Sequence, residues 1–380
     1  MYKRCNDYYD CEDKSDENEC QKVKVDEVSY KKNQPPFVDG EQIKINVSIY
    51  LMNINKIQLP KIFDAKFKLR LTWIDYRLEY HNLHHTGNLI EIETQEKLWI
   101  PPLRFSNTKD NKWLKNDAKT TMNIVKGARY NIVDVDNPIP HDLTELHEGN
   151  VFIGSENIVK YSREYQMEFQ CHYNLRNYPF DKQKCTIDLQ VPRLLHVYMD
   201  LKANTTENWG STELAQFVIT DIDIHSINNK TLVQCIIHMK RIPLYHIATI
   251  YLPTLCIIFM ALITLYIDQS HFEATVMVAL TCMLVMHTLF QSISESMPTT
   301  TYLTLLDIWL MFCLVLPFVV FTIEVVWELM DQKIKSNAIS ARKGNKRPSE
   351  KSPLRKAKCI LPTITIAFVT IYSMVVIILY

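Results

Sequence analysis

The chain is poor in glycine and lacks the motifs that enzymes build around it. Seven glycines occur among 380 residues, which leaves little for the loops that hold nucleotide or phosphate cofactors. The sequence also contains no nucleophile–base signature and no CxxC pairs. These absences argue against an enzyme. Excess charge of one sign is missing too, because 42 Lys and Arg balance 42 Asp and Glu, so composition predicts no nucleic-acid partner.

Apolar residues are concentrated in four long runs toward the C-terminal end. A membrane-spanning helix needs about 20 apolar residues, and each run reaches that length with few or no charged side chains. Buried helices of a soluble protein are the alternative, but four such runs would be hard to keep in solution. The sequence therefore predicts four transmembrane helices, at residues 244–267, 275–294, 302–327 and 360–380.

Basic residues orient these helices. Segment 331–358 contains ten Lys and Arg against Asp331 and Glu350, and such an excess marks a cytoplasmic loop. Counting back places residues 1–240 and the C-terminus outside the cell, as in a multi-pass protein of the plasma membrane. The chain opens without an apolar targeting core, so we expect a signal segment upstream. Three N-x-S/T sequons precede the first span as predicted glycosylation sites: Asn46, Asn204 and Asn229.

The first residues are acidic and cysteine-rich. Residues 5–20 read CNDYYDCEDKSDENEC, which resembles the second half of a low-density-lipoprotein-receptor class A module. The resemblance implies a disulfide between Cys5 and Cys20, with Cys11 lacking its partner in a truncated module. It also implies Ca²⁺ in the untruncated chain, because a hard cation prefers oxygen ligands; these would be Asn6, Asp10, Asp16 and Glu17. A disordered acidic tail is the alternative.

Residues 35–242 show the alternation of half-buried strands. Residues 67–73 place apolar side chains at every second position, so that Phe67, Leu69, Leu71 and Trp73 share one face. We expect this face in the core and the opposite face, with Lys68 and Arg70, pointing outward. Roughly ten runs of this kind predict an extracellular antiparallel β-sandwich.

A pair of cysteines near the middle of the chain carries a family resemblance. Cys171 and Cys185 enclose thirteen residues that include Asn177-Tyr178-Pro179-Phe180-Asp181. Together with W-x-D at 73–75, W-x-P at 99–101 and four later spans, this order resembles the Cys-loop, or pentameric ligand-gated, ion channels over residues 35–380. The resemblance implies a Cys171–Cys185 disulfide and a homo- or hetero-pentamer in membrane lipid. It also implies a ligand-binding β-sandwich followed by a four-helix transmembrane bundle.

These observations divide the chain into six parts. The predicted bounds are a partial class A module at 1–20, a linker at 21–34, the β-sandwich at 35–242, three transmembrane helices at 243–330, the basic loop at 331–358 and a fourth helix at 359–380.

The resemblance further implies a small-molecule agonist held between subunits. Lys68 and Arg70 lie on the expected complementary side, and Arg70 matches an arginine of GABA- and glycine-receptor-like subunits that meets the agonist carboxylate. A guanidinium suits that task by its bidentate geometry, and a solvated strand charge is the alternative. Trp99 and Tyr198 are the other candidate contacts.

The expected principal side is sparse in aromatic residues. Among Tyr, Phe and Trp, residues 191–198 contain only Tyr198, and the hairpin at 225–234 contains none. An aromatic box for an ammonium group is therefore poorly supported. Three histidines are the candidates for proton or metal chemistry in its place: His172, His196 and His225.

The second apolar run predicts a pore helix. Steps of three or four residues from Glu273 give one helical stripe, which continues through Met277, Thr281, Leu284, Thr288, Ser292 or Gln291, and Glu295. Hydroxyls line its middle, Leu284 forms a hydrophobic belt, and carboxylates lie at both ends. Rings of carboxylates favour cations, and rings of Lys or Arg favour anions. A lipid-facing stripe is the alternative.

Other residues resemble the anion-selective branch of the family, among them Arg77-Leu78 and Asp307-Ile308-Trp309. That branch carries Pro-Ala-Arg at the inner mouth of the pore, where this chain reads Glu273-Ala274-Thr275. We therefore predict a cation-selective filter on an anion-branch scaffold. A chloride channel, or an accessory subunit without its own agonist site, is the alternative.

Gating is expected to pass through the loop between the two cysteines. By the resemblance, the coupling residues are Tyr178, Pro179, Phe180, Asp181, Arg241 and Pro298. Agonist binding would then shift a closed–open equilibrium by its different affinity for the two states.

Overall fold

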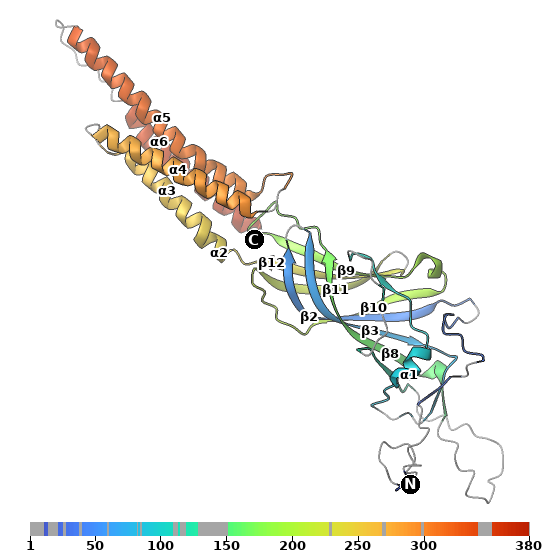
Figure 1. Cartoon of the computed structure of the whole chain (residues 1–380). Helices are drawn as coiled ribbons and strands as arrows, with labels where there is room; N and C mark the ends of the chain where they lie inside the picture. The colour runs from blue at the N-terminus through green and yellow to red at the C-terminus, as the bar shows by residue number, and fades with distance from the viewer. Residues whose placement is uncertain are drawn as a thin grey trace, which may run out of the picture. The chain divides into compact units, whose positions relative to one another are not determined.

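The computed structural model describes most of the chain. The described residues are 11–13, 22–25, 28–37, 40–58, 61–81, 83, 86–108, 113–114, 119–127, 151–227, 230–267, 271–297, 300–340 and 352–379. They fold into two compact units (Figure 1). The first comprises Met1–His172, Lys184–Leu214 and Ile219–His238, and the second comprises Tyr173–Gln183, Ala215–Val218 and Met239–Tyr380.

Three sheets contain the strands. The five-stranded sheet has the order β10 (Met199–Asn208), β2 (Ile43–Gln58), β3 (Ile62–Ile74), β8 (Ile158–Gln170) and β6 (Thr121–Val125). The four-stranded sheet has the order β11 (Phe217–Ile227), β12 (Leu232–Arg241), β9 (Lys182–Gln190) and β5 (Arg104–Phe105). The small sheet joins β1 (Val23–Lys24), β4 (Glu79–His81) and β7 (Val151–Ile153), and α1 (Ile92–Lys97) follows β4 along the chain.

One strand pair departs from the predicted antiparallel sandwich. β10 runs parallel to β2, with Met199 opposite Ile43 and Asn208 opposite Leu51. Parallel partners require a long crossover rather than a hairpin, and here strands β3 to β9 lie between the two in sequence. The other pairs in this sheet, β2–β3, β3–β8 and β6–β8, are antiparallel.

The core of the sheet unit follows the predicted alternation. Along β3, buried residues alternate with half-buried ones, and Phe67, Leu69 and Leu71 are fully buried. Phe67 meets Phe105 of the four-stranded sheet edge to face, with 5.6 Å between ring centroids. Burying a large apolar side chain contributes about 1.5–3 kcal/mol, so this alternation fixes which face of β3 can look outward.

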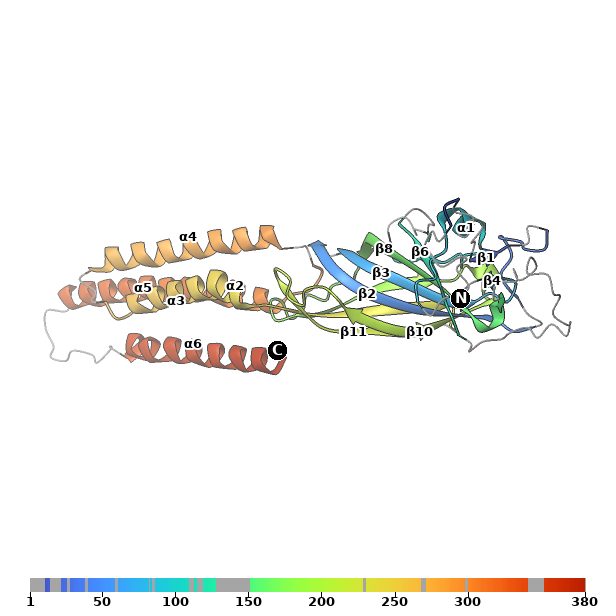
Figure 2. The ribbon, with the colours of Figure 1, turned by 90° about the horizontal axis from the view of Figure 1, so that it is seen from below.

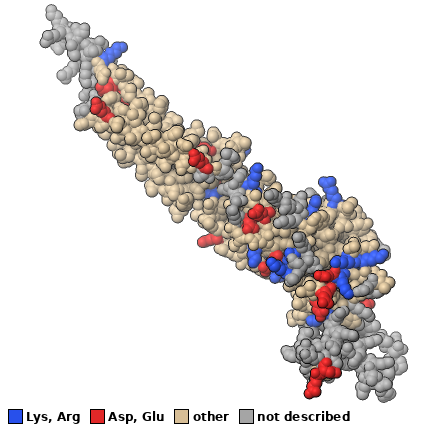
Figure 3. Space-filling model, in the orientation of Figure 1, with Lys and Arg blue, Asp and Glu red and all other residues tan. Residues whose placement is uncertain are grey.

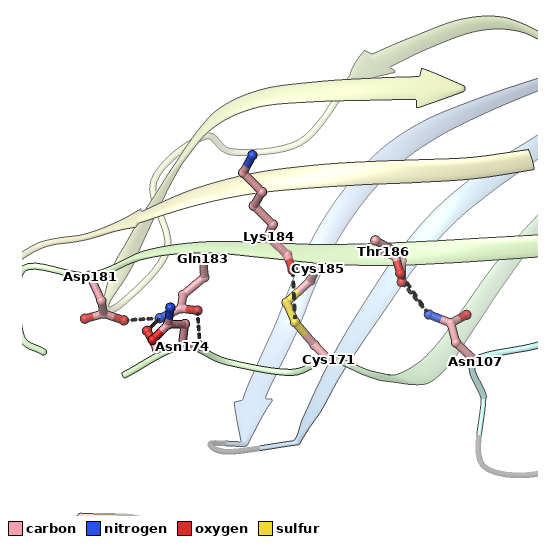
Figure 4. Close-up of a disulfide and its surroundings, with 8 residues drawn as sticks. All are labelled: Asn107, Cys171, Asn174, Asp181, Gln183, Lys184, Cys185 and Thr186. Carbon is pink, nitrogen blue, oxygen red and sulfur yellow. Dashed lines mark hydrogen bonds between the residues drawn. A yellow bond between two sulfur atoms is a disulfide. The ribbon is translucent and has the colours of Figure 1, made fainter. Parts of the chain in front are cut away.

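The predicted disulfide between Cys171 and Cys185 is confirmed (Figure 4). It joins the residue after β8 to β9, with 5.2 Å between the two Cα atoms. Asn107 steadies the same strand, because its Nδ2 donates to the Thr186 carbonyl at 2.6 Å and the Asp188 amide donates to its Oδ1 at 3.1 Å. The other predicted disulfide, Cys5–Cys20, lies outside the described residues, as do the predicted calcium ligands Asn6, Asp10, Asp16 and Glu17. Cys11 is described and is a free, exposed thiol.

The second unit contains the helices. These are α2 (Leu244–His246), a π-helical turn at Ile247–Tyr251, α3 (Leu252–Thr264), α4 (Phe272–Ser296), α5 (Leu305–Ser340) and α6 (Ser352–Leu379). Four stretches are long and apolar enough to cross a membrane: Leu244–Thr264, Phe272–Glu295, Leu305–Met330 and Lys358–Leu379. Their surface shows little charge between its ends (Figure 3).

The helices pack through buried polar contacts as well as apolar ones. Figure 2 shows α4 and α6 on opposite sides of α3 and α5. The Trp309 indole donates to the Thr254 hydroxyl at 3.0 Å, which joins α5 to α3. The hydroxyls of Tyr251 and Tyr372 lie 2.7 Å apart and join the π-helical turn to α6. Hydrogen bonds between apolar helices of this kind hold them in one arrangement.

Candidate functional site

The helical unit contains a buried ion pair at the end of β12. Arg241 and Asp181 are each 1% exposed. Arg241 Nε donates to Asp181 Oδ1 at 2.6 Å, and Nη2 donates to Oδ2 at 3.2 Å. The Arg241 amide also donates to the Asp181 carbonyl at 3.1 Å. This bidentate geometry is the strong form of an arginine–carboxylate pair, and it fixes the residues after Pro179 against the start of the first apolar helix.

Aromatic rings close the space around this pair. The Arg241 guanidinium carbon lies 4.3 Å from the Phe217 ring centroid and 4.8 Å from that of Tyr178. Its Nη1 donates to Gln216 Oε1 at 3.2 Å. A buried guanidinium is tolerated when its donors are paired and its faces are covered by π-systems, and Arg241 meets both conditions.

The Tyr178 hydroxyl connects the same loop to α2. It lies 2.6 Å from His246 Nε2. Burial raises the pKa of Tyr178, while the charge of Arg241 opposes that rise, so the hydroxyl is neutral near pH 7. His246 Nδ1 is buried and has no partner among the described residues. The Tyr178–His246 bond is therefore the polar anchor of this histidine within the described chain.

Further contacts tie the loop to the start of α5. The Leu175 amide donates to the Tyr302 hydroxyl at 3.0 Å, and the Leu305 amide donates to the Arg176 carbonyl at 2.8 Å. The loop is braced internally as well, because Gln183 Nε2 donates to the Asn174 carbonyl at 2.8 Å. Four of the predicted coupling residues, Tyr178, Phe180, Asp181 and Arg241, thus have contacts within one cluster, with Phe180 against Tyr251 at 6.1 Å between centroids. Pro298 lies outside the described residues.

A second candidate site is the outward face of the five-stranded sheet around Arg70. Arg70 Nη1 donates to the Tyr50 hydroxyl at 2.6 Å, and the guanidinium lies 4.6 Å from the Tyr50 ring centroid. The Arg70 Nε is buried without a partner among the described residues. Trp209 stacks on Tyr50 at 4.4 Å, and Lys68 Nζ lies 5.9 Å from the Trp209 ring. Lys68 and Arg70 therefore flank an aromatic surface.

The charge on this face is predominantly positive. Burial lowers the pKa of Lys160, and the nearby charges of Arg70 and Lys68 lower it further. Lys160 lies opposite Thr72 in the β3–β8 register, next to Arg70. The carboxylate of Glu164 on the same face pairs with Lys66 at 3.4 Å. An anion reaching this face would meet several cations and relieve their mutual repulsion.

The four-stranded sheet contains the segment predicted as the principal side. Residues 191–198 follow β9 and include a short 3₁₀ turn at Arg193–Leu195. Tyr198 is partly exposed and packs edge to face on Phe37 at 5.3 Å. Arg104 of β5 lies opposite Gln190 in the β5–β9 register. The predicted principal side thus has one partly exposed tyrosine, Tyr198, and a cationic residue on the adjoining strand, Arg104.

Trp99 does not take part in either surface. It is 4% exposed and packs edge to face on Trp73, with 5.9 Å between ring centroids, and its backbone amide donates to the Tyr30 hydroxyl at 2.8 Å. Trp99 is thus a core residue of the described chain, and a ligand contact at this position stays a prediction. Among the described residues no three His, Cys, Asp or Glu side chains gather as a metal site. The ring of His196 instead lies 3.0 Å from the Val191 carbonyl.

The predicted stripe on α4 is exposed along its length. Glu273, Met277, Thr281, Leu284, Thr288, Gln291, Ser292 and Glu295 are all exposed, whereas Thr275, Ala279, Cys282 and Met286 are buried against the unit's own helices. Met277 and Leu284 are 64% and 63% exposed. Gln291 Nε2 donates to Glu295 Oε1 at 3.0 Å. The face that the sequence predicts for the pore is thus free of packing within one chain.

The predicted sequons occupy different environments. Asn46 is half-buried on β2, where it lies between Thr72 of β3 and Lys202 of β10. Asn204 is exposed, and its Nδ2 donates to the Ser48 hydroxyl at 3.3 Å. Asn229 lies outside the described residues. Of the two described sequons, Asn204 is the more accessible.

Sequence reasoning missed several residues of the charged surfaces. Tyr50, Trp209 and Lys160 belong to the Arg70 face, and Arg104 belongs to the opposite sheet. Alternation along β2 and β8 places Tyr50 and Lys160 on a strand but does not say which strand lies beside Arg70. Of these residues, only Trp209 could have been singled out from the sequence, because it is the one large aromatic residue in the polar segment 202–212.

Comparisons with known proteins match both the sheet-rich part and the helical part of the chain to one family. Residues 20–245 match the family model for the neurotransmitter-gated ion-channel ligand binding domain, and residues 250–356 match the model for the neurotransmitter-gated ion-channel transmembrane region. A glutamate-gated chloride channel subunit beta of Haemonchus contortus is 23% identical over 287 residues, which are 71% of this chain and 60% of that protein. The chain thus spans about three fifths of the length of this curated relative.

Proposed function

The chain belongs to the neurotransmitter-gated ion-channel family, and from this premise we propose that it is a subunit of a pentameric channel opened by a small carboxylate-bearing agonist. It is a multi-pass membrane protein with four spans and not an enzyme. The agonist would bind between the sheet units of neighbouring subunits, and α4 would line the pore. The observation that carries the agonist class is Arg70, a guanidinium on a cationic face with an uncommitted Nε.

Assembly with other subunits accounts for apolar surface that a single chain leaves uncovered. An apolar groove of about 580 Å³ runs between α4 and α5, and its lining includes Leu280, Leu314, Val315 and Phe318. Val315 and Phe318 are more than half exposed. A neighbouring subunit's helix would bury this groove, since small or uncharged helix faces associate by close packing in a membrane.

Voltage-clamp recording from cells that express the subunit tests the agonist class. L-glutamate, 4-aminobutyrate and glycine carry a carboxylate, whereas acetylcholine carries none. We expect a current from at least one carboxylate ligand, and Arg70→Gln should raise its half-maximal concentration more than tenfold, because a charge-assisted hydrogen bond contributes about 1.5–3 kcal/mol. Lys66→Gln removes a charge from the same strand, but from a residue paired with Glu164, and should have little effect. Activation by acetylcholine alone would exclude this agonist class.

We propose that the pore prefers cations. The support is Glu273 at the inner end of an exposed stripe, since a ring of carboxylates attracts cations. The second candidate is a chloride channel, favoured by the likeness to the nematode glutamate-gated chloride channel subunit. At 23% identity that function does not transfer to this chain, and ion substitution separates the two.

An accessory subunit is the remaining alternative. The single exposed tyrosine of residues 191–198 and the absence of aromatic residues in 225–234 favour it. Such a subunit would reach the cell surface but give current only beside a partner subunit. Expression alone and with related subunits distinguishes the two cases: agonist current from the chain expressed alone would exclude a purely accessory function.

The N-terminal and topological proposals rest on sequence. We propose that residues 5–20 belong to a calcium-holding class A module, which Asp16→Asn would weaken in a ⁴⁵Ca²⁺ binding assay. We also propose that the N- and C-termini are extracellular. Glycosidase treatment tests the extracellular position of the N-terminal part. It should lower the apparent mass on electrophoresis, and Asn204→Gln should reduce that change.

A further inference from the structure

Arg104 lies at the edge of the four-stranded sheet, beside the start of the 191–198 segment. It belongs to the two-residue strand β5, in which Phe105 points into the core and Arg104 is half-buried on the other side. Its Cα partner in β9 is Gln190, the last residue of that strand. Gln190 and Asp188 alternate with the buried Leu189, so Arg104 shares its face with both.

The guanidinium of Arg104 is nearly uncommitted. Its Nη2 donates to Gln190 Oε1 at 3.4 Å, which is long for a hydrogen bond. Its Nε is buried without a partner in the described part of the chain. No carboxylate among the described residues lies within 4 Å of it. Asp188, on the same face, accepts from Gln234 Nε2 at 2.9 Å instead. An arginine has five donors, and a buried donor left unpaired costs free energy unless a ligand or water satisfies it.

Two other described arginines show the paired state that Arg104 lacks. Arg77 pairs with Asp75 at 2.7 Å, and Arg241 pairs with Asp181 at 2.6 Å. Arg70 resembles Arg104 instead, because its Nε is also unpaired among the described residues and its Nη1 donates to the neutral Tyr50 hydroxyl. Among the described residues, Arg70 of the five-stranded sheet and Arg104 of the four-stranded sheet are thus both without a carboxylate within 4 Å.

We propose that Arg104 is a second anion-binding residue of the agonist site, and that the agonist is a small dicarboxylate. The inference rests on the proposed function, in which the outward faces of two neighbouring subunits meet around the agonist. Arg70 of one subunit would hold one carboxylate, and Arg104 of its neighbour would hold the other. An ammonium group in the second position would face a guanidinium and would be repelled.

The surroundings of Arg104 fit this assignment. Gln190 offers a neutral amide, and the adjacent 191–198 segment carries Arg193 and a single tyrosine rather than an acidic residue. A carboxylate in this place gains bidentate hydrogen bonds that an isosteric carboxamide lacks. The difference between an acid and its amide therefore measures the contribution of Arg104, whatever the rest of the agonist contributes.

Ligand binding to the purified full-length protein tests the proposal. Calorimetry with L-glutamate against L-glutamine, and L-aspartate against L-asparagine, compares each carboxylate with its neutral amide of the same shape. We expect the unmodified protein to bind the acid about 10- to 100-fold more tightly, the range of one or two charge-assisted hydrogen bonds. Arg104→Gln should reduce that ratio to about one, and Arg104→Lys should retain part of it. Lys184→Gln, which removes an exposed cation from the other end of β9, should leave the ratio unchanged.

The outcomes separate this inference from the proposed function. Equal binding of acid and amide to the unmodified protein, with both lost in Arg70→Gln, keeps a carboxylate agonist and overturns the role of Arg104. An acid preference that survives in Arg104→Gln overturns it too. Binding of 4-aminobutyrate or glycine without binding of any of the four probes overturns the dicarboxylate and keeps the proposed function, whereas absence of binding by all six contradicts the proposed agonist class itself. Thermal unfolding without ligand identifies a variant that fails to fold, in which case Arg104→Lys supplies the test.

Discussion

Arg241 and Asp181, sixty positions apart in the chain, form a bidentate ion pair from which water is excluded. Tyr178 and Phe217 cover the guanidinium, and Tyr178 continues to His246. Removing one member of a buried pair leaves an uncompensated charge, which costs about 3–5 kcal/mol. In the proposed channel, a change of agonist occupancy would act on a loop that is held this firmly, and a rigid pair would transmit that movement rather than absorb it.

The first prediction concerns the pair itself. Arg241→Ala should abolish agonist current, because Asp181 then loses its partner and the loop loses its connection to the end of β12. Surface biotinylation alongside current recording separates gating from assembly. The double variant R241A/D181A removes both charges and should restore surface expression where the single variant reduces it, without restoring current. Normal agonist currents in R241A would contradict the coupling role.

The second prediction concerns the hydrogen bond between Tyr178 and His246. Tyr178→Phe should shift the half-maximal agonist concentration about 3- to 10-fold, because one hydrogen bond of roughly 0.5–1.5 kcal/mol is lost and both ring nitrogens of His246 are left unpaired. Tyr173→Phe is the matched control. The Tyr173 hydroxyl is buried in the same unit without a partner among the described residues, so its removal should change the dose response little. Equal effects of the two variants would argue against a specific role for the bond.

The third prediction uses the electrostatics of the Arg70 face. Burial, and then the charge of Arg70, lower the pKa of Lys160. A pKa that is lower in the folded state means that the charged lysine opposes folding below that pKa, and that this penalty disappears as pH rises through it. Lys160→Gln should therefore raise the unfolding temperature of the ligand-free protein at neutral pH. It should also weaken carboxylate binding up to about fivefold, as expected for a partly exposed charge. A lower unfolding temperature would show that Lys160 stabilises the fold.

The sequence predicted the periodic and local features of this chain well. The alternation along β3 identified which residues are buried, and the resemblance to the Cys-loop family identified the Cys171–Cys185 disulfide. Element boundaries depended on capping that the hydropathy pattern does not register. The third span was predicted from residue 302, but α5 begins at Leu305 because Thr304 caps it: the Asp307 amide donates to the Thr304 hydroxyl, and the Thr304 amide donates back to Asp307 Oδ2.

Features that depend on distant parts of the chain could not be predicted in the same way. The parallel pairing of β10 with β2 follows from the path of the intervening strands, which no local pattern encodes. Trp99 looked like a binding residue by its motif, whereas its burial against Trp73 depends on packing between segments 26 residues apart. The partners of Arg70 come from β2 and from the end of β10, and those of Arg104 from β9. A lone arginine in a strand gives no indication of whether a carboxylate will lie beside it.

The fourth prediction concerns the inner end of α4. Glu273→Gln should reduce the preference for cations, since it removes one carboxylate from each subunit at the level where the anion-selective branch carries Pro-Ala-Arg. Glu295→Gln removes the carboxylate at the other end of the helix, which hydrogen-bonds to Gln291, and should have the smaller effect on ion preference. Single-channel recording in mixed sodium and chloride solutions compares the two. Identical selectivity in both variants and the unmodified channel would place the filter elsewhere.

The reversal potential of the agonist current, measured before and after dilution of external sodium chloride at constant osmolarity, tests the central claim most directly. The account predicts a shift to more negative potentials, because sodium carries the current through a pore lined by Glu273 and Glu295. A shift to more positive potentials would show that chloride carries it, and would contradict the proposed cation channel.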